Sequence, residues 1–215
     1  MNVITKPKHP AKYTDSLLPV FERMLAGCKN VLDPFAGTGK IHSLPFETVG
    51  VEIEKEWAEM HEKTIIGDAT DLQFANCEFD AICTSPTYGN RMADCHEAKD
   101  KSTRNTYTHK LGRTLNDNNS GKMQWGEKYK ELHIKAWNEC FRVLKKDGVF
   151  ILNFKNHIRK GKEIDAFSWH VSELLKIGFS VEIIEQVETK GNGFGQNAKL
   201  RTGFEFVARF RKPNA

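Results

Sequence analysis

The chain has 215 residues and a mass of 24.5 kDa, which suits one domain with a sizeable core rather than two independent domains. Its 39% hydrophobic and 28% charged residues are typical of a soluble globular protein, and no stretch is apolar enough to cross a membrane. The N-terminus lacks an apolar signal core, and the five scattered cysteines form no C-x-x-C pair, so we expect a reducing cytoplasm and no metal site. The net charge of +4 leans weakly towards an anionic partner.

Short apolar runs rich in Val and Ile alternate with longer mixed segments, a pattern typical of a parallel sheet wrapped in helices. We therefore expect an α/β fold with a mostly parallel seven-stranded sheet, an antiparallel C-terminal hairpin and helices on both faces. Helices are predicted at residues 14–26, 54–62, 127–146 and 165–177. Strands are predicted at residues 30–34, 48–53, 64–67, 79–84 and 148–154, followed by the hairpin segments SVEIIEQVET and GFEFVARFRK.

Residues 89–126 do not fit this alternation, because they carry little apolar periodicity and many Lys, Arg, Asn and His residues. A loop of this length inside a compact domain is usually functional or disordered. We therefore expect a single domain over residues 1–215, with a long basic loop inserted after its fourth strand.

The first predicted strand is followed by a glycine-rich turn, DPFAGTGK, where the backbone can approach a ligand closely. The ATP-binding P-loop pattern fails twice, because Pro34 stands in place of its first glycine and Ile41 in place of its Ser or Thr. The dinucleotide pattern G-x-G-x-x-G fits Gly37 and Gly39 but finds His42 in third place. A plain glycine turn is a further alternative.

Acidic residues stand at the ends of the first three predicted strands: Asp33, Glu52 and Asp68. Ligands of open α/β sheets gather at the carboxyl ends of the strands, so we expect these side chains to lie close together. Asp33 can hold a cationic or hydroxyl group, Glu52 can accept hydrogen bonds from a ribose, and Asp68 can accept one from an adenine amine. Glu54 is the alternative to Glu52, and a single acid of this kind is more often a helix cap. Together, beside a glycine turn, they predict an adenosine pocket.

Five motifs resemble those of class I S-adenosylmethionine (SAM)-dependent methyltransferases that act on amino groups of nucleic-acid bases. DPFAGTG resembles motif I of that family, VGVEIE motif II, GDA motif III, TSPTY the Asp/Asn/Ser-Pro-Pro-Tyr motif IV, and KHPAKYTDSLL motif X. The order X, I, IV is that of the gamma group of DNA amino-methyltransferases. The resemblance covers most of the chain and implies a Rossmann-like methyltransferase fold that binds SAM without a metal. The cofactor-binding residues that it implies are Lys12, Tyr13, Asp33, Phe35, Gly37, Gly39, Glu52, Ile53, Asp68 and Ala69.

Motif IV bears on the chemistry, because the lone pair of an exocyclic amine is delocalised into the base and must be drawn out before methylation. By resemblance, the catalytic groups are the Ser85 side chain and the Pro86 carbonyl, which accept the two N–H bonds, and Tyr88, which stacks on a flipped base. An ordinary strand-terminating turn is the alternative.

The sequence departs from the family pattern at two places. Thr87 replaces the second proline of motif IV, which predicts a less rigid loop. The connection KIHSLPFE after Gly39 is short, so the helix usual in the family is expected to shrink to a turn. Serine at position 85 is commoner in the family among enzymes that act on cytosine amines.

Basic and aromatic residues follow the fourth and fifth predicted strands and therefore flank the expected site. Lys and Arg can bind phosphates there, and aromatic rings can fill the gap left by a flipped base, although a solvated charged face is the alternative. We expect residues 89–126 to be mobile alone and to become ordered with nucleic acid. The predicted substrate-binding residues are Arg91, Arg104, Tyr107, Lys155 and Arg159.

We therefore predict a methyltransferase that transfers a methyl group from SAM to the exocyclic amine of cytosine or adenine in DNA, as in restriction-modification or phage DNA modification. The alternatives are an RNA base amino-methyltransferase, a protein glutamine methyltransferase and a non-catalytic SAM-binding subunit that positions DNA. The glutamine enzymes carry asparagine where this chain has Ser85, and the intact motif from Ser85 to Tyr88 argues against a silent subunit. The chain leaves little room for a recognition domain, so a long loop, a partner subunit or a homodimer is expected to supply sequence specificity.

Overall fold

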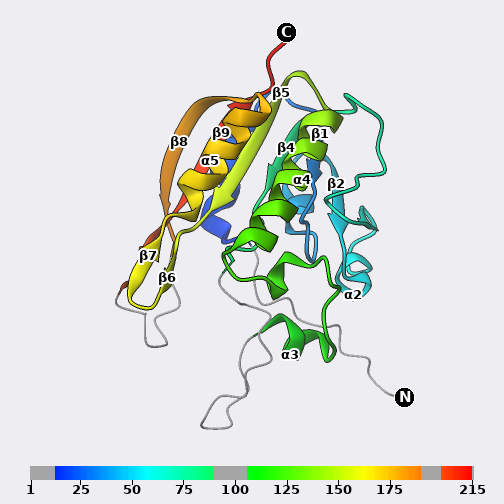
Figure 1. Cartoon of the computed structure of the whole chain (residues 1–215). Helices are drawn as coiled ribbons and strands as arrows, with labels where there is room; N and C mark the ends of the chain where they lie inside the picture. Colours follow the sequence, from blue (N-terminus) through cyan, green and yellow to red (C-terminus); the bar gives the residue numbers. More distant parts are fainter. Residues whose placement is uncertain (1–12, 90–105, 190–199, 215) are drawn as a thin grey trace, which may run out of the picture.

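Seven strands form one sheet in the order β3-β2-β1-β4-β5-β9-β8 (Figure 1). The computed structural model describes residues 13–89, 106–189 and 200–214. Neighbouring strands from β3 to β5 are parallel, while β9 runs antiparallel to both β5 and β8, which confirms the predicted sheet. The strands are β1 (Asn30–Asp33), β2 (Glu47–Glu52), β3 (Thr64–Ile66), β4 (Phe79–Thr84), β5 (Leu144–Phe154), β8 (Ser180–Glu188) and β9 (Phe204–Arg211).

Hydrophobic layers cover both faces of the central strands. Along β4, Ile82 packs into the layer under α4 and α5, while Ala81 and Cys83 pack into the layer closed by α1. Successive side chains of a strand point to opposite faces, so the continuous apolar run of β4 serves both layers. The helices on both faces were predicted and are confirmed. The helical elements are η1 (Asp15–Leu17), α1 (Leu18–Met24), η2 (Lys40–Ser43), α2 (Lys55–Ala58), α3 (Tyr107–Leu111), η3 (Ser120–Lys122), α4 (Glu127–Val143) and α5 (Ala166–Ile177).

Two predicted helices end earlier than expected. The helix predicted at residues 127–146 stops at Val143, because β5 begins at Leu144 and pairs there with Phe79 of β4. The helix predicted at residues 54–62 is reduced to the four residues of α2, because the chain then turns to enter β3.

The connection after the glycine turn contains only η2, a single 3₁₀ turn, as predicted from its length. Gly39 precedes it with φ 77°, a left-handed conformation that glycine adopts without strain. A Cβ at this position would lie 2.7 Å from the His42 ring and 2.9 Å from the His61 Cβ atom. Both the backbone conformation and the close packing against His42 and His61 therefore favour glycine at position 39.

A small hairpin, β6 (His157–Arg159) and β7 (Lys162–Ile164), follows β5 and was not predicted. Its two turn residues, Lys160 and Gly161, both have positive φ angles. The hairpin therefore depends on its two-residue turn and not on an apolar pattern that the sequence analysis could have detected. Residues 106–126 of the predicted long loop contain α3 and η3, and residues 90–105 lie outside the described part. No helix in the described ranges is sufficiently long and apolar to traverse a bilayer.

Candidate active site

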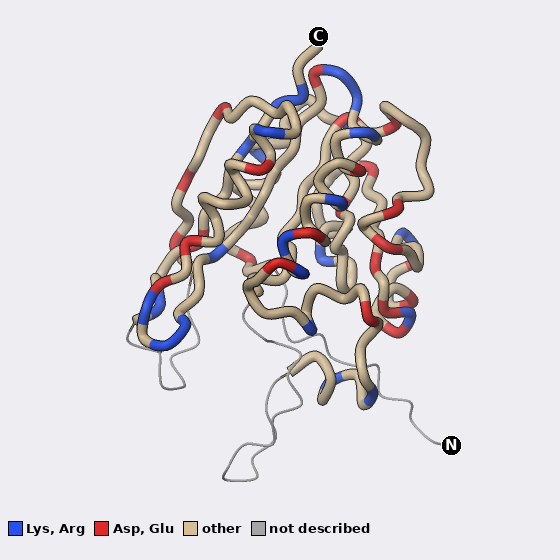
Figure 2. Tube along the Cα trace, viewed as in Figure 1, with Lys and Arg blue, Asp and Glu red and all other residues tan. Residues whose placement is uncertain are grey.

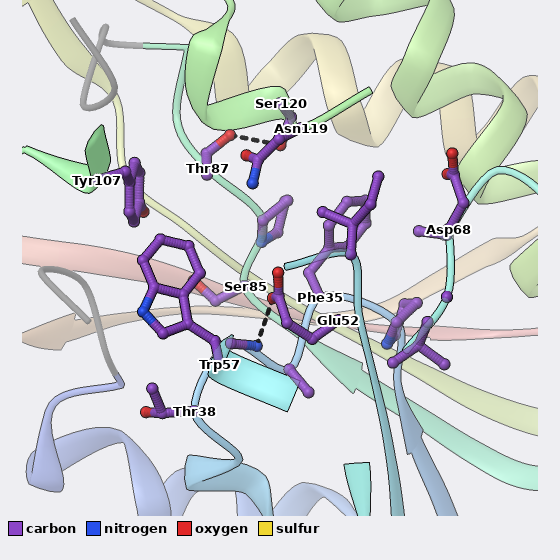
Figure 3. A pocket seen from close by; sticks show the side chains of 18 of the residues that line it. Phe35, Thr38, Glu52, Trp57, Asp68, Ser85, Thr87, Tyr107, Asn119 and Ser120 are labelled. Carbon is purple, nitrogen blue, oxygen red and sulfur yellow. Dashed lines mark hydrogen bonds between the residues drawn. The ribbon is translucent and has the colours of Figure 1, made fainter. Parts of the chain in front are cut away.

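A cavity of about 280 Å³ opens at the carboxyl ends of the parallel strands (Figure 3). Trp57 and Tyr107 lie together at one side of it and Asp68 lies at the other. Of the predicted site residues, eleven line this cavity: Tyr13, Phe35, Gly37, Glu52, Ile53, Asp68, Ala69, Ser85, Pro86, Tyr88 and Tyr107. At least one residue from each of motifs I to IV and X therefore lines the same cavity.

Other predicted site residues lie elsewhere. Asp33 and Gly39 stand behind the cavity wall and do not line it. Lys155 and Arg159 follow β5 and also lie outside the lining. Three predicted residues fall outside the described residues: Lys12, Arg91 and Arg104.

Glu52, the last residue of β2, holds the glycine turn that follows β1. Its Oε2 atom accepts a hydrogen bond from the Gly37 amide at 3.0 Å, and its Oε1 atom accepts one from the Glu54 amide at 2.8 Å. Each carboxylate oxygen keeps a further lone pair, so Glu52 can also accept hydrogen bonds from a ligand in the cavity. Burial raises the pKa of Glu52 to about 7, because the charged carboxylate loses solvation.

Asp33 organises the wall behind the cavity. Its carboxylate accepts hydrogen bonds from the Tyr13 hydroxyl, from Thr84 Oγ1 at 2.7 Å and from the Phe35 amide at 3.0 Å. Burial raises the pKa of Asp33 to about 6. Since all three donors belong to the protein, Asp33 holds Tyr13 and the start of the glycine turn in place.

Glu54 anchors a segment that covers the cavity. This cover segment, residues 113–120, donates three hydrogen bonds to the Glu54 carboxylate: from Arg113 Nη2 at 2.7 Å, from the Asn116 amide at 2.8 Å and from Asn119 Nδ2 at 2.8 Å. The Glu54 side chain is only 1% exposed and does not line the cavity. Its hydrogen bonds therefore hold the cover segment and do not face a ligand. Arg113 also pairs with Glu56, so its charge is compensated within the protein.

The cover segment reaches both sides of the cavity. Asn118 donates a hydrogen bond from Nδ2 to Asp68 Oδ2 at 2.9 Å, and its neighbours Asn119 and Ser120 also line the cavity. At the far side, the rings of Trp57 and Tyr107 meet at 5.5 Å and pack with Leu115 in a small buried cluster. Tyr107 thus forms part of the wall rather than a projecting side chain.

Ser85 and Tyr88 of motif IV are linked to Glu205 at the start of β9. Ser85 Oγ lies 3.3 Å from the Tyr88 hydroxyl, which donates to Glu205 Oε2 at 3.1 Å. Burial raises the pKa of Tyr88 well above its usual value, with a further contribution from the Glu205 charge, so Tyr88 stays a protonated phenol. The Tyr88 ring also lies 4.9 Å from the Phe154 ring.

Three hydrogen bonds hold the motif IV loop where it leaves β4. The Thr87 carbonyl accepts a hydrogen bond from the Tyr129 hydroxyl, and the Gly89 carbonyl accepts one from the Trp125 amide at 2.9 Å. Thr87 Oγ1 lies 2.7 Å from Ser120 Oγ of the cover segment (Figure 3). Gly89 has φ 66°, and a Cβ there would lie 3.2 Å from the Trp125 nitrogen. The hydroxyl of Thr87 therefore supplies a tether in place of the rigidity of proline.

Lys and Arg residues occur along the β6–β7 hairpin beside this end of the sheet (Figure 2). Lys155 Nζ donates to Thr189 Oγ1 at 3.2 Å. Arg159 donates to the Trp125 carbonyl at 3.2 Å and to Gln124 Oε1 at 2.9 Å. The two predicted phosphate-binding side chains thus flank the active-site edge of the sheet.

Sequence reasoning missed several residues of the cavity wall. Trp57 was assigned only to the helix predicted at residues 54–62, although a large aromatic five residues after Glu52 was an available signal. Glu205 carried no local signal, since it lies within an ordinary strand pattern. The other omissions from the cavity wall include Lys40, Asn118, Asn119, Ser120 and Leu132.

The fold is that of Rossmann-like, class I SAM-dependent methyltransferases. A SAM-dependent methyltransferase from Methanosarcina mazei is 13% identical with a TM-score of 0.59, covering 92% of this chain and 98% of that chain. A Pyrococcus horikoshii protein is 17% identical with a TM-score of 0.59, covering 98% and 96%. A SAM-dependent methyltransferase from Archaeoglobus fulgidus is 14% identical with a TM-score of 0.56, covering 91% of each chain.

A family model described as DNA methylase matches residues 79–215, which is more than half of the chain. The chain therefore belongs to the N6/N4 DNA methylase family and is a SAM-dependent methyltransferase. A comparison with curated protein sequences finds no match.

The glycine turn and the hydrogen-bond acceptors of the cavity fit SAM. The glycine turn lets the backbone approach a ligand, because Gly37 has φ 54° and no side chain to intervene. Glu52 presents a carboxylate with spare acceptor capacity and Asp68 a second acceptor, which matches the polar edges of an adenosine. When bound, SAM supplies an electrophilic methyl group.

Proposed function

We propose that the protein transfers the methyl group of SAM to the exocyclic amine of cytosine or adenine in DNA. The observation that carries this proposal is that Ser85, Pro86 and Tyr88 line the same cavity as Glu52 and Asp68. An amine acceptor site and an adenosine site within one cavity are what methyl transfer to a base requires. The match of the chain to DNA methylases favours DNA over RNA as the polymer.

On the cofactor side, Glu52 accepts hydrogen bonds from the ribose hydroxyls and Asp68 orients the adenine. Tyr13 closes the cavity near the motif IV loop, since its hydroxyl is held by Asp33. The cover segment excludes water from the reacting groups through Asn119 and neighbouring residues.

On the base side, Ser85 Oγ and the Pro86 carbonyl accept the two N–H bonds of the amine and draw its lone pair out of the ring. Such preorganised acceptors act where charge changes in the transition state. Tyr88 stacks on the flipped base, and Phe154 supports the Tyr88 ring. Serine at position 85 favours cytosine over adenine.

Binding of the DNA backbone is assigned to the basic residues that flank the cavity edge. Lys155 precedes the β6–β7 hairpin and Arg159 lies within it, and Arg91 and Arg104 join them in this proposal. Residues 1–215 act as one catalytic domain, with sequence specificity supplied by the long loop, a partner subunit or a second copy.

The test is to incubate the protein with isotopically labelled SAM and mixed-sequence DNA or RNA, digest both polymers and identify labelled nucleosides by mass spectrometry. We expect cytosine in DNA to be labelled on its exocyclic amine ahead of adenine. The Ser85→Ala variant is the negative control. Label on a ring carbon would refute amine chemistry, and label confined to RNA would reassign the polymer.

A further inference from the structure

Glu205 is a buried carboxylate that no motif accounts for. It lies at the start of β9 opposite Val187 of β8, is 8% exposed and lines the cavity. A buried carboxylate is costly unless polar groups compensate its charge. Among the hydrogen bonds of the described residues, its side chain accepts one from the Tyr88 hydroxyl.

The direction of the hydrogen bonds in this chain of groups follows from counting protons. A phenol has one O–H, and Tyr88 donates it to Glu205, because an ionised carboxylate can only accept. The Tyr88 oxygen must then accept in its contact with Ser85 Oγ, so the Ser85 proton points towards Tyr88. The lone pairs of Ser85 Oγ are consequently left for the N–H of a substrate amine.

The chemistry needs a destination for one proton. When the amine nitrogen forms its bond to the methyl carbon, the sulfur–carbon bond of SAM breaks and the nitrogen is left with one proton too many. A serine hydroxyl is too weak a base to keep this proton. A carboxylate two hydrogen bonds away can take it through the intervening hydroxyls.

Resting on the proposed function above, we propose that Glu205 is the positioning residue that accepts this proton through Tyr88 and Ser85. The amine proton passes to Ser85 Oγ, the Ser85 proton passes to the Tyr88 oxygen, and the Tyr88 proton passes to Glu205 Oε2. Ser85 and Tyr88 end neutral, Glu205 ends as a carboxylic acid, and the methylated amine ends uncharged. Release of the Glu205 proton to water then restores the starting state.

Charged and titratable side chains reach Glu205 from neighbouring elements. Lys155, which follows β5, interacts electrostatically with Glu205 and is held by Thr189 at the end of β8. Burial lowers the pKa of Lys155, the Glu205 charge opposes this, and Arg201 lowers it further. Tyr88 is the titratable group that faces Glu205 from the motif IV loop. Lys155 therefore adds a basic group to the surroundings of Glu205.

The test compares Glu205→Gln with wild type in single-turnover methylation of DNA between pH 6 and pH 9. Glutamine keeps the size of the side chain and can accept from Tyr88, but it cannot take the proton. We expect the rate to fall about a hundredfold near neutral pH, with SAM affinity and the DNA KM within about twofold of wild type. The variant rate should rise with pH, as hydroxide replaces the lost acceptor, to a greater extent than in wild type.

Two further variants keep the test decisive. Tyr88→Phe cuts the same proton path, so it should reproduce the pH profile of Glu205→Gln even where Glu205→Gln folds poorly. In Glu205→Ala, added formate should restore part of the rate, whereas formate should not restore Ser85→Ala. Glu188→Gln is the matched control, because Glu188 is exposed on the neighbouring strand, and it should retain the wild-type rate and pH profile.

The outcomes separate the two proposals. A wild-type rate and pH profile in Glu205→Gln and Tyr88→Phe, together with a slow Ser85→Ala variant, would overturn the role of Glu205 and leave the proposed function intact. Wild-type rates in all three variants would overturn the proposed function as well.

Discussion

The two sides of the cavity use buried carboxylates differently. On the cofactor side, Glu54 accepts three hydrogen bonds from the cover segment and Glu52 accepts two from backbone amides. On the base side, the Glu205 side chain accepts a hydrogen bond from Tyr88. The donors to Glu54 and Glu52 belong to loops that these carboxylates fix in place, whereas the donor to Glu205 is a hydroxyl that also contacts Ser85. The carboxylates of the cofactor side therefore hold loops in position, whereas Glu205 ends a chain of hydroxyls that suits the proton transfer proposed above.

The largest expected effect separates the two sides. Ser85→Ala removes an acceptor that acts on the base only, so turnover should fall about a hundredfold while SAM affinity stays nearly unchanged. Single-turnover methylation and calorimetry with SAM measure the two quantities. A parallel loss of SAM affinity would show that the two sides are not separate.

Glu52→Ala should have the converse effect. It removes the ribose acceptor and releases the Gly37 amide, so SAM binding should weaken by about 1–3 kcal/mol, measured by calorimetry. At saturating SAM, the methylation rate should recover to within a few-fold of wild type. Unchanged affinity would remove Glu52 from the cofactor site.

A smaller effect is expected from the anchor of the cover segment. Arg113→Ala removes one of three donors to Glu54, and because Arg113 is 41% exposed we expect a loss of about 1 kcal/mol in SAM affinity. Limited proteolysis should cut residues 106–122 faster in this variant. Lys128→Ala removes an exposed positive charge elsewhere and is the control. Equal cleavage in both variants would contradict an anchoring role for Arg113.

The smallest effect is a pH dependence of stability. Burial raises the pKa of Asp33 to about 6 and of Glu52 to about 7, so the folded protein binds protons that the unfolded chain releases. Their contribution to stability is complete below about pH 4 and is lost as the pH rises through 6 to 7. From pH 5 to pH 8, Tm should fall by about 2–4 °C for each 1 kcal/mol lost, and less steeply in Glu52→Gln. A Tm that rises over this range would contradict the assignment.

The sequence predicted those parts of the site that depend on strand ends. Glu52, Asp68 and Ser85 each follow an apolar run, and parallel strands bring such positions to one edge of the sheet. Local patterns were therefore enough to place them in one cavity. The same patterns predicted the parallel direction of the central strands and the antiparallel C-terminal pair.

The remaining parts depend on contacts between distant residues. Arg113 lies 59 residues from Glu54 and Tyr88 lies 117 residues from Glu205, so no local pattern reports either pair. The cover segment also lacks apolar periodicity, because polar bonds to Glu54 hold it. Its one basic residue, Arg113, belongs to the basic run that was expected to bind phosphates, although it pairs with Glu54 and Glu56 within the protein.

The hydrogen bond between Thr87 and Ser120 joins the motif IV loop to the cover segment. If SAM binding orders the cover segment, this hydrogen bond also stabilises the motif IV loop. Linkage is reciprocal, so the base must favour SAM by the same factor by which SAM favours the base. The proposed function therefore predicts that this hydroxyl, which stands in place of a proline, makes SAM and the base cooperative ligands of each other.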